Sequence, residues 1–196
     1  MTALKIKVVT GTEILPYIDA LADLRTGVFR AWPYLYDGTL KNEQTYLQGY
    51  ASCPHSVMIL ALDKDAVVGA STAVPLKVAD PNFRNAFTES DYPVESVLYL
   101  AESALLSSYR GRGIGHQFFD AREKHAVSIG AHYTAFCAVE RPSNDPRRPK
   151  DYQDLDAFWK KRGYTNHPEI RTNFDWRDVG DSVESAHSLS FWIKKP

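Results

Sequence analysis

The six residues at positions 110–115, Arg-Gly-Arg-Gly-Ile-Gly, constrain the fold more than any other part of this sequence. An apolar run typical of a β-strand, Val97 to Leu106, precedes them, and a helical pattern from Ile114 to Ser128 follows. Glycines let the backbone turn sharply and approach a ligand, and a helix N-terminus presents free N–H groups to an anion. The segment therefore predicts a phosphate-binding loop, to which Arg110 and Arg112 add positive charge.

Two other phosphate-binding loops do not fit these residues. The P-loop requires Gly-Lys followed by Ser or Thr, and no such tripeptide follows here. The dinucleotide motif G-x-G-x-x-G also fails. Counted from Gly111, His116 stands at the third glycine; counted from Gly113, Phe118 stands there. Neither a P-loop NTPase nor a Rossmann enzyme is favoured.

A different pattern, Arg/Gln-x-x-Gly-x-Gly/Ala, is met by Arg110, Gly113 and Gly115. With it the chain resembles the GNAT superfamily of N-acetyltransferases, in which this loop holds the pyrophosphate of acetyl-CoA. Residues 155–164, Leu-Asp-Ala-Phe-Trp-Lys-Lys-Arg-Gly-Tyr, look like the family's helix that ends in glycine and an aromatic residue. The resemblance covers Lys5 to Ile193. The cofactor-binding residues that it implies are Leu105, Leu106, Arg110, Gly111, Arg112, Gly113, Ile114, Gly115 and His116.

Composition limits the other classes of protein. A chain of 196 residues with 44% hydrophobic and 24% charged residues is typical of one compact domain, residues 1–196. The formal net charge of -1 offers no general attraction for nucleic acid or an anionic membrane, and no apolar run reaches the ~20 residues of a membrane helix. The lone pair of cysteines and the start without a signal-peptide core favour the cytoplasm. No metal-binding motif is present.

Periodicity predicts alternating strands and helices. The expected strands are 5–9, 55–63, 66–74, 97–106, 132–139, 171–176 and 189–193, and the expected helices are 14–32, 40–50, 80–87, 114–128 and 152–162. In the helix 114–128, Arg122 is expected to face water. The pattern alone indicates a single layer-packed α/β domain. The resemblance implies the mixed α+β GNAT acyl-CoA N-acyltransferase fold, with a central mixed sheet of about seven strands and helices on both faces.

The resemblance also implies a site and a reaction. Acetyl-CoA would lie where the strands 97–106 and 132–139 splay apart, with backbone groups near Leu105 free to pair with its pantetheine arm. In the family's reaction an amine attacks the thioester carbonyl directly in a ternary complex, and coenzyme A leaves as a thiol. Such a reaction needs a base for the amine, an N–H donor for the oxyanion and an acid for the thiolate.

Glu102 is the candidate general base, because it is the carboxylate of an apolar strand that ends at the phosphate-binding loop. Burial there would raise its pKa toward the working range of a base. In the alternative interpretation it pairs with a Lys or Arg of a helix. Family bases commonly lie farther back, where this chain has Tyr99, so a bulge in the strand would change which side chains face the cleft. Ser103 is a weaker candidate for contact with substrate or water.

The residue that would protonate the leaving thiolate is the next question. Family members commonly have a Tyr where this chain has Trp159, and an indole N–H cannot protonate a thiolate. Tyr152 stands where the family often has Asn, so it is the candidate acid, with water as the alternative. Cys137 is expected to be a small buried hydrophobe rather than an acylated nucleophile. His132 and His116 are expected at the surface.

The acceptor remains open between a small-molecule amine and a peptide amine. Trp32, Tyr34 and Tyr36 form an aromatic cluster that either builds part of the acceptor pocket or packs in the core. The charged loop 140–151 either meets an acidic substrate or is solvated, and solvation is favoured. Use of another acyl-CoA, or coenzyme A binding without turnover, are the alternative functions. The oligomeric state is open, with a homodimer as one option.

Overall fold

The computed structural model describes residues 4–196, which form a sheet of eight strands with helices on both faces. The strands are β1 (Lys5–Thr10), β2 (Val57–Asp63), β3 (Ala66–Pro75), β4 (Val97–Tyr99), β5 (Ser103–Leu105), β6 (Tyr133–Val139), β7 (Thr165–Trp176) and β8 (Ser185–Lys194). The helices are α1 (Ile18–Val28), α2 (Leu40–Ala51), α3 (Pro81–Asn85), α4 (Ile114–Ser128) and α5 (Asp156–Lys161). Short 3₁₀ turns are η1 (Gly11–Tyr17), η2 (Leu76–Val78), η3 (Val94–Ser96) and η4 (Ser107–Tyr109).

The sheet is mixed, as predicted. Its order is β1-β2-β3-β4-β6-β8-β7, with β5 paired to β3 beside this path. The pair β4 and β6 is parallel, and the other pairs are antiparallel. The sheet has eight strands instead of about seven because the predicted strand 97–106 is two strands, β4 and β5.

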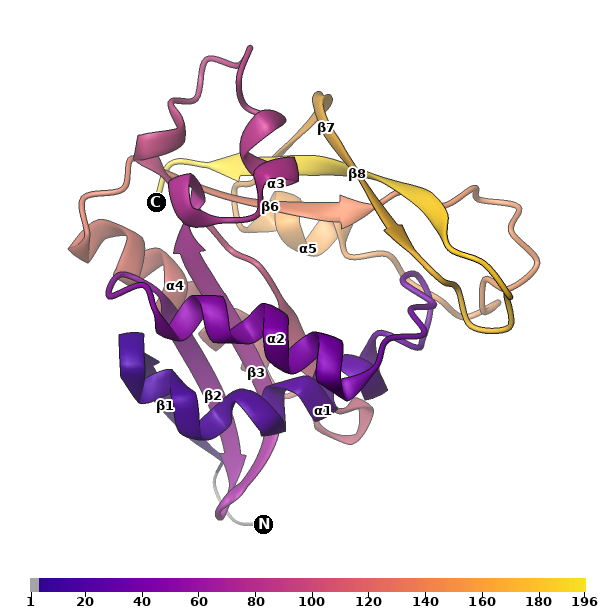
Figure 1. Cartoon of the computed structure of the whole chain (residues 1–196), viewed down its shortest axis with the longest axis horizontal. Coiled ribbons are helices and arrows are strands. Elements are labelled where there is room, and N and C mark those ends of the chain that lie inside the picture. Colours follow the sequence, from indigo (N-terminus) through magenta and orange to yellow (C-terminus); the bar gives the residue numbers. More distant parts are fainter. Residues whose placement is uncertain (1–3) are drawn as a thin grey trace.

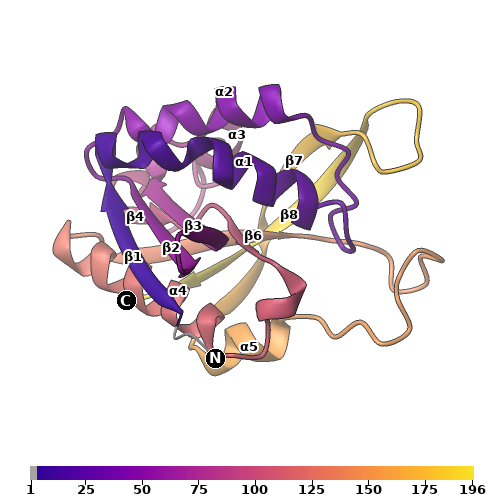
Figure 2. The same ribbon diagram turned by 90° about the horizontal axis from the view of Figure 1, so that it is seen from below.

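The helices cover opposite faces of this sheet. Figure 2 shows α1 and α2 above it and α4 and α5 below it. In β2, Met58, Leu60 and Leu62 belong to the core beneath α1 and α2. The alternate residues Val57 and Ile59 pack in the second core with α4. Because successive side chains of a strand point to opposite faces, a strand buried on both sides reads as a continuous apolar run.

A bulge separates β4 from β5. Thr72 of β3 faces two residues of the neighbouring strand: the Ala101 N–H donates to the Thr72 carbonyl at 3.1 Å, and the Thr72 N–H donates to the Glu102 carbonyl at 3.0 Å. The register of β3 therefore shifts by one residue between Val74, which faces Tyr99, and the β5 pairs. Such an extra residue bends the strand and breaks the alternation of its side chains. The prediction of one continuous strand was wrong for this reason.

Other element boundaries differ from the sequence-based expectations. The first predicted helix opens as the 3₁₀ turn η1, which contains Pro16, and α-helix begins only at Ile18. The predicted helix 152–162 begins at Asp156, so Tyr152 lies in the preceding loop. Strands β7 and β8 are longer than the predicted strands 171–176 and 189–193. A hairpin this long is stabilised by pairing between strands, which periodicity does not report.

The two-sided core gives a test of the layer arrangement. Ile59→Ala and Leu60→Ala should each lower the free energy of unfolding by about 2–5 kcal/mol, because both side chains are fully buried, on opposite faces of β2. Val8→Ala on the edge strand β1 is the matched control, since Val8 is 51% exposed, and its cost should stay below about 0.5 kcal/mol. Urea denaturation measures all three. A small effect of either core substitution would contradict burial on both faces.

Candidate functional site

A cleft opens between β5 and β6, just beyond the end of the β4–β6 pairing. The parallel pairing of β4 with β6 ends at Tyr99 opposite Ala135, and the Leu100 N–H makes one further bond to the Ala135 carbonyl at 2.7 Å. Beyond this point β5 pairs with β3, while β6 pairs with β8. The space between them belongs to a cavity of about 910 Å³, which is lined by β5, β6, α5, the loop 110–116 and the segment after α1.

One edge of β5 is free to bind a ligand. The Glu102 carbonyl and the Leu106 N–H are bonded to β3, at Thr72 and Val68. Hydrogen bonding alternates along an antiparallel pair, so the N–H and carbonyl groups of Ser103 and Leu105 point the other way, into the cleft. The Leu105 carbonyl there accepts a hydrogen bond from Arg110 Nε at 3.3 Å. The Leu105 N–H and the N–H and carbonyl of Ser103 therefore make no hydrogen bond to β3, whereas the Leu105 carbonyl is already used by Arg110.

The glycine-rich loop places a helix N-terminus at the same cleft. Gly111 and Gly113 have φ values of +73° and +76°, a left-handed conformation that favours glycine. The first N–H of α4 with an acceptor inside the helix is that of Gln117, which donates to the Gly113 carbonyl at 3.3 Å. The preceding N–H groups of α4 have no helical acceptor, so they form the anion-binding end of a helix.

Most of the predicted cofactor residues line the cavity. Those that do are Leu105, Arg110, Gly111, Gly113, Ile114, Gly115 and His116. Leu106 is not among them, and its N–H is used in the bond to β3. Arg112 also lies outside: its guanidinium donates to the Ser108 carbonyl at 2.8 Å and covers the Tyr109 ring. The side chain of Ile114 is buried in the core, so only its backbone can serve a ligand.

Glu102 lies at the bulge and lines the cleft, although it is only 4% exposed. Its Oε2 accepts a hydrogen bond from Arg25 of α1 at 2.8 Å, and its Oε1 accepts one from the Thr72 hydroxyl at 2.6 Å. Arg25 also pairs with the buried Glu43 of α2. Burial raises the pKa of Glu102, and Arg25 opposes this shift without cancelling it. Glu102 thus pairs with an arginine of a helix, as the alternative interpretation expects. It also lines the cleft, as the interpretation as a general base expects.

Arg122 was missed as a residue of the site. It is 1% exposed instead of facing water, and burial lowers its pKa to about 10. Its Nη1 donates to the carbonyls of Thr72 and Glu102, each at 3.3 Å, so it binds both sides of the bulge. It also lines the cavity. The helical pattern of residues 114–128 does not indicate that an arginine packs inward and donates hydrogen bonds to backbone carbonyls of the sheet.

The sequence matches the family model of the acetyltransferase (GNAT) family over residues 21–164. The chain belongs to the GNAT acetyltransferase family. Membership of this family supports the interpretation that the protein is an acyltransferase. A search of curated proteins by sequence found no match.

Solved structures share the GNAT fold at low sequence identity. An N-acetyltransferase from Staphylococcus aureus is 14% identical, with a TM-score of 0.59 and 99% of each chain covered. A ribosomal-protein-alanine N-acetyltransferase from Brucella melitensis is 16% identical, with a TM-score of 0.62 over 98% of this chain and 99% of that chain. The structure of yncA from Salmonella typhimurium with its cofactor acetyl-CoA is 10% identical, with a TM-score of 0.60 over 99% of this chain and 94% of that chain. These similarities establish the fold alone.

The family's Tyr position is occupied by Trp159, which lines the cleft and packs on Phe136 and Trp192. Tyr152 lines the cleft as well, half-buried, and burial raises its pKa, so its phenol keeps its proton at neutral pH. Cys137 lines the cleft with its Sγ 3.2 Å from the Tyr99 hydroxyl, and burial raises its pKa to about 12. A thiol with this pKa is a poor nucleophile at neutral pH.

The two candidate histidines lie at the surface, as expected. His132 is exposed at the start of β6 and does not line the cavity. His116 is exposed in the first turn of α4, against the Phe158 ring. No group of three or more His, Cys, Asp or Glu side chains within residues 4–196 could hold a metal ion. In the same range no helix has the length and apolarity needed to cross a membrane.

The buried carboxylate of Asp178 stabilises the wall of the cleft that is formed by the segment after α1 and the loop 140–151. Asp178 accepts two hydrogen bonds from Arg141, both at 2.7 Å, and one from Arg147 at 2.8 Å. Arg141 also donates to the carbonyls of Pro33 and Tyr34, in the loop between α1 and α2. Burial alone would raise the pKa of Asp178, but the arginines hold it below its usual range. Much of the charge in the loop 140–151 is therefore structural.

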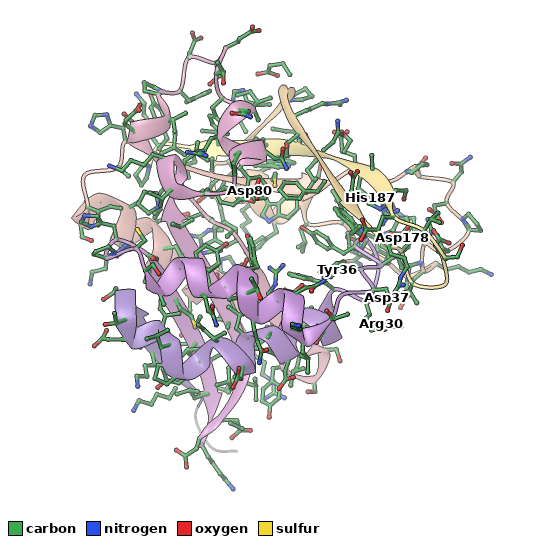
Figure 3. The ribbon with its side chains drawn as sticks, in the orientation of Figure 1. Arg30, Tyr36, Asp37, Asp80, Asp178 and His187 are labelled. Atoms are coloured by element: carbon green, nitrogen blue, oxygen red, sulfur yellow. The ribbon has the colours of Figure 1, made fainter. Side chains whose placement is uncertain are left out.

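Figure 3 shows where this wall lies: Asp178 and His187 stand beside Tyr36 and Asp37, where the β7–β8 hairpin meets the α1–α2 loop. The bridge between Tyr36 and Asp178 joins the same two segments. Tyr36 also reaches Glu43, to which its hydroxyl donates at 2.7 Å. Of the predicted aromatic cluster, Trp32 and Tyr34 line the cavity and Tyr36 does not.

Asp178→Ala should lower the free energy of unfolding by about 3–5 kcal/mol, because it leaves the buried guanidinium of Arg141 without its counter-charge. Asp37→Ala is the control, since Asp37 pairs with Arg30 and Arg177 at the surface, and its cost should stay below about 1 kcal/mol. Urea denaturation measures the difference. Equal effects of the two substitutions would contradict the central role of Asp178.

Proposed function

We propose that this protein transfers the acetyl group of acetyl-CoA to the amine of a small-molecule or peptide acceptor by direct attack in a ternary complex. The observation that carries the proposal is the cleft itself. A free strand edge at Ser103 and Leu105 leads to the free N–H groups of α4. This combination suits a ligand with an amide-containing arm and a diphosphate. GNAT membership supports the same reaction class.

The residues present fit such a ligand. The N–H groups at the start of α4 and the exposed guanidinium of Arg110 would hold the diphosphate, while the backbone of Leu105 would pair with the pantetheine amides. Acetyl-CoA supplies an activated thioester when bound. The cleft supplies a wall of apolar and aromatic side chains, including Phe136, Trp159 and Trp192, that would exclude water from it.

Glu102 would take the proton of the attacking amine. It is the carboxylate at the bulge, beside the free strand edge, and it lines the cleft. Its Oε1 accepts a hydrogen bond from Thr72 and its Oε2 accepts one from Arg25, and each oxygen keeps a second lone pair. Arg25 fixes its orientation, and burial keeps its basicity above that of an exposed carboxylate.

Tyr152 would donate its proton, or a hydrogen bond, to the departing thiolate. Its phenol is protonated at neutral pH and lines the same cleft. A thiol of coenzyme A has a cysteine-like pKa of ~8 to 9 and leaves well, so this help is modest. Trp159 stands where the family commonly has Tyr, and an indole N–H cannot protonate a thiolate. This favours one second candidate function, coenzyme A binding without turnover.

The loop geometry predicts an effect on acetyl-CoA affinity. Gly113→Ala should weaken binding about tenfold or more, because a side chain disfavours the φ of +76° and a shift of the loop loses at least one charge-assisted hydrogen bond. Gly130→Ala is the matched control: Gly130 has a φ of +75° at the other end of α4, away from the cleft. Both variants should lose about 1 kcal/mol of stability. Isothermal titration calorimetry should show weakened acetyl-CoA binding for Gly113→Ala alone; equal affinity in both variants would contradict the loop's role.

The proposed base predicts a pH dependence. An acid whose pKa is raised on folding becomes an effective base only as the pH rises through that raised value, above the ordinary 4.5. The rate of thiol release should therefore rise with pH over this limb in the wild type, and Glu102→Gln should lack the limb and react about 10²- to 10⁴-fold more slowly. The exposed Glu95→Gln is the control. A Glu102→Gln variant with the wild-type rate and profile would remove Glu102 from the mechanism.

Release of free thiol from acetyl-CoA in the presence of a panel of amines tests the function as a whole. An enzyme of the proposed kind binds acetyl-CoA and releases thiol only when an acceptor amine is added. Heat of binding without thiol release for any amine would support the binding module instead. Release with longer acyl-CoA but not with acetyl-CoA would identify a different acyl donor.

A further inference from the structure

Three arginines stand close together in the charged loop, and one of them has a different environment. Arg141 and Arg147 are both bonded to Asp178. Arg148 has no carboxylate partner among residues 4–196; its guanidinium carbon lies 5.1 Å from the centroid of the Tyr152 ring. It is half-buried and lines the cleft. Arg148 is therefore a cation whose position is set by an aromatic ring and whose charge is available to a ligand.

Trp32, which also contacts the Tyr152 ring, adds a second donor without an acceptor in the described part of the chain. The Trp32 ring stands edge-on to Tyr152, with centroids 6.1 Å apart, and lines the same cleft. The side chain is 9% exposed, and its Nε1–H is buried without an acceptor in the described part of the chain. A buried N–H without an acceptor is costly. A ligand that brings an acceptor oxygen to this wall would remove that cost.

The carboxylates of the cleft do not neutralise Arg148. Those that line it are Glu102, Glu140, Asp154 and Asp156. Glu102 is bonded to Arg25, Glu140 to Arg171, and Asp156 lies 4.0 Å from Lys160. Asp154 is exposed and forms no ion pair with Arg148, although its charge also acts on Tyr152. The wall of Arg148, Tyr152 and Trp32 thus offers donors and positive charge, which suit an anionic oxygen.

We propose that Arg148 recognises a carboxylate on the acceptor, so that the substrate class is an amine that also carries a carboxylate, such as an amino acid. This inference rests on the proposed function. The diphosphate of acetyl-CoA has its own donors at 110–116, whereas Arg148 packs on Tyr152, whose ring meets Trp32 in the segment after α1. A phosphate of coenzyme A has the same anionic chemistry as a carboxylate, so the experiment must separate the two.

The experiment compares the L-amino acids with their amides as acceptors, using thiol release from acetyl-CoA. The wild type should prefer the acids, and Arg148→Gln should lower kcat/KM for the acids about 10- to 100-fold, the loss expected for a hydrogen bond to a charged group. The same variant should lower kcat/KM for the amides much less than for the acids, so that the preference for the acids is lost. Arg148→Lys, which keeps the charge, should retain part of the preference.

The controls separate charge, cosubstrate and fold. Lys150→Gln removes an exposed charge from the same loop without touching the cleft and should keep the preference. Affinities for acetyl-CoA and for 3′-dephospho-acetyl-CoA, measured by calorimetry, should be unchanged in Arg148→Gln, which also shows that the variant is folded. Weaker binding of acetyl-CoA but not of the dephospho form would assign Arg148 to the phosphate and overturn the proposal.

Two further outcomes would also overturn it: acetylation of amides or simple amines without any carboxylate preference, or no acetylation of any amine that carries a carboxylate. In the first case the proposed acetyltransferase function stands and only the acceptor class is wrong. Failure of acetyl-CoA to bind, or of every amine to react, would instead contradict the proposed function itself.

Discussion

The bulge opposite Thr72 is the constraint on which the rest of the site depends. It gives Thr72 two partners, Ala101 and Glu102, in place of one, at the point where the pairing with β3 continues into β5 and the pairing with β6 ends. The cleft, the free backbone edge and the position of Glu102 beside that edge all follow from this single extra residue. Arg122 of α4 (Figure 1) donates to both carbonyls at the bulge, so the helix that follows the glycine-rich loop also holds the strand in place.

Charge in this cleft divides into a structural and an available part. Arg25 forms ion pairs with the buried Glu43 and Glu102, and Arg141 forms one with the buried Asp178. These pairs stabilise the structure around the cleft but leave little positive charge for a ligand. Arg110 and Arg148 line the cleft without carboxylate partners among residues 4–196. A protein with a formal net charge of -1 can therefore bind anions, because the sum over the chain does not describe the local field.

Local features of the site could be predicted from the sequence, and features that depend on distant contacts could not. The loop 110–115 was recognisable because left-handed turns require glycine and because a strand and a helix flank it. Burial of Arg122 depends on a bond to a carbonyl 50 residues away, and the bond between Arg141 and Asp178 spans 37 residues. Periodicity carries no information about such pairs, nor about the bulge, which is set by pairing with β3.

Hydrogen exchange at β5 tests the central claim most directly. If the bulge frees this strand edge for acetyl-CoA, the amides of Ser103 and Leu105 should exchange readily in the free protein and become protected when acetyl-CoA is added. The amide of Ala104, which faces Ala70 of β3, should be protected in both states. Protection of Ser103 and Leu105 without ligand, or no change on adding acetyl-CoA at saturating concentration, would contradict the account.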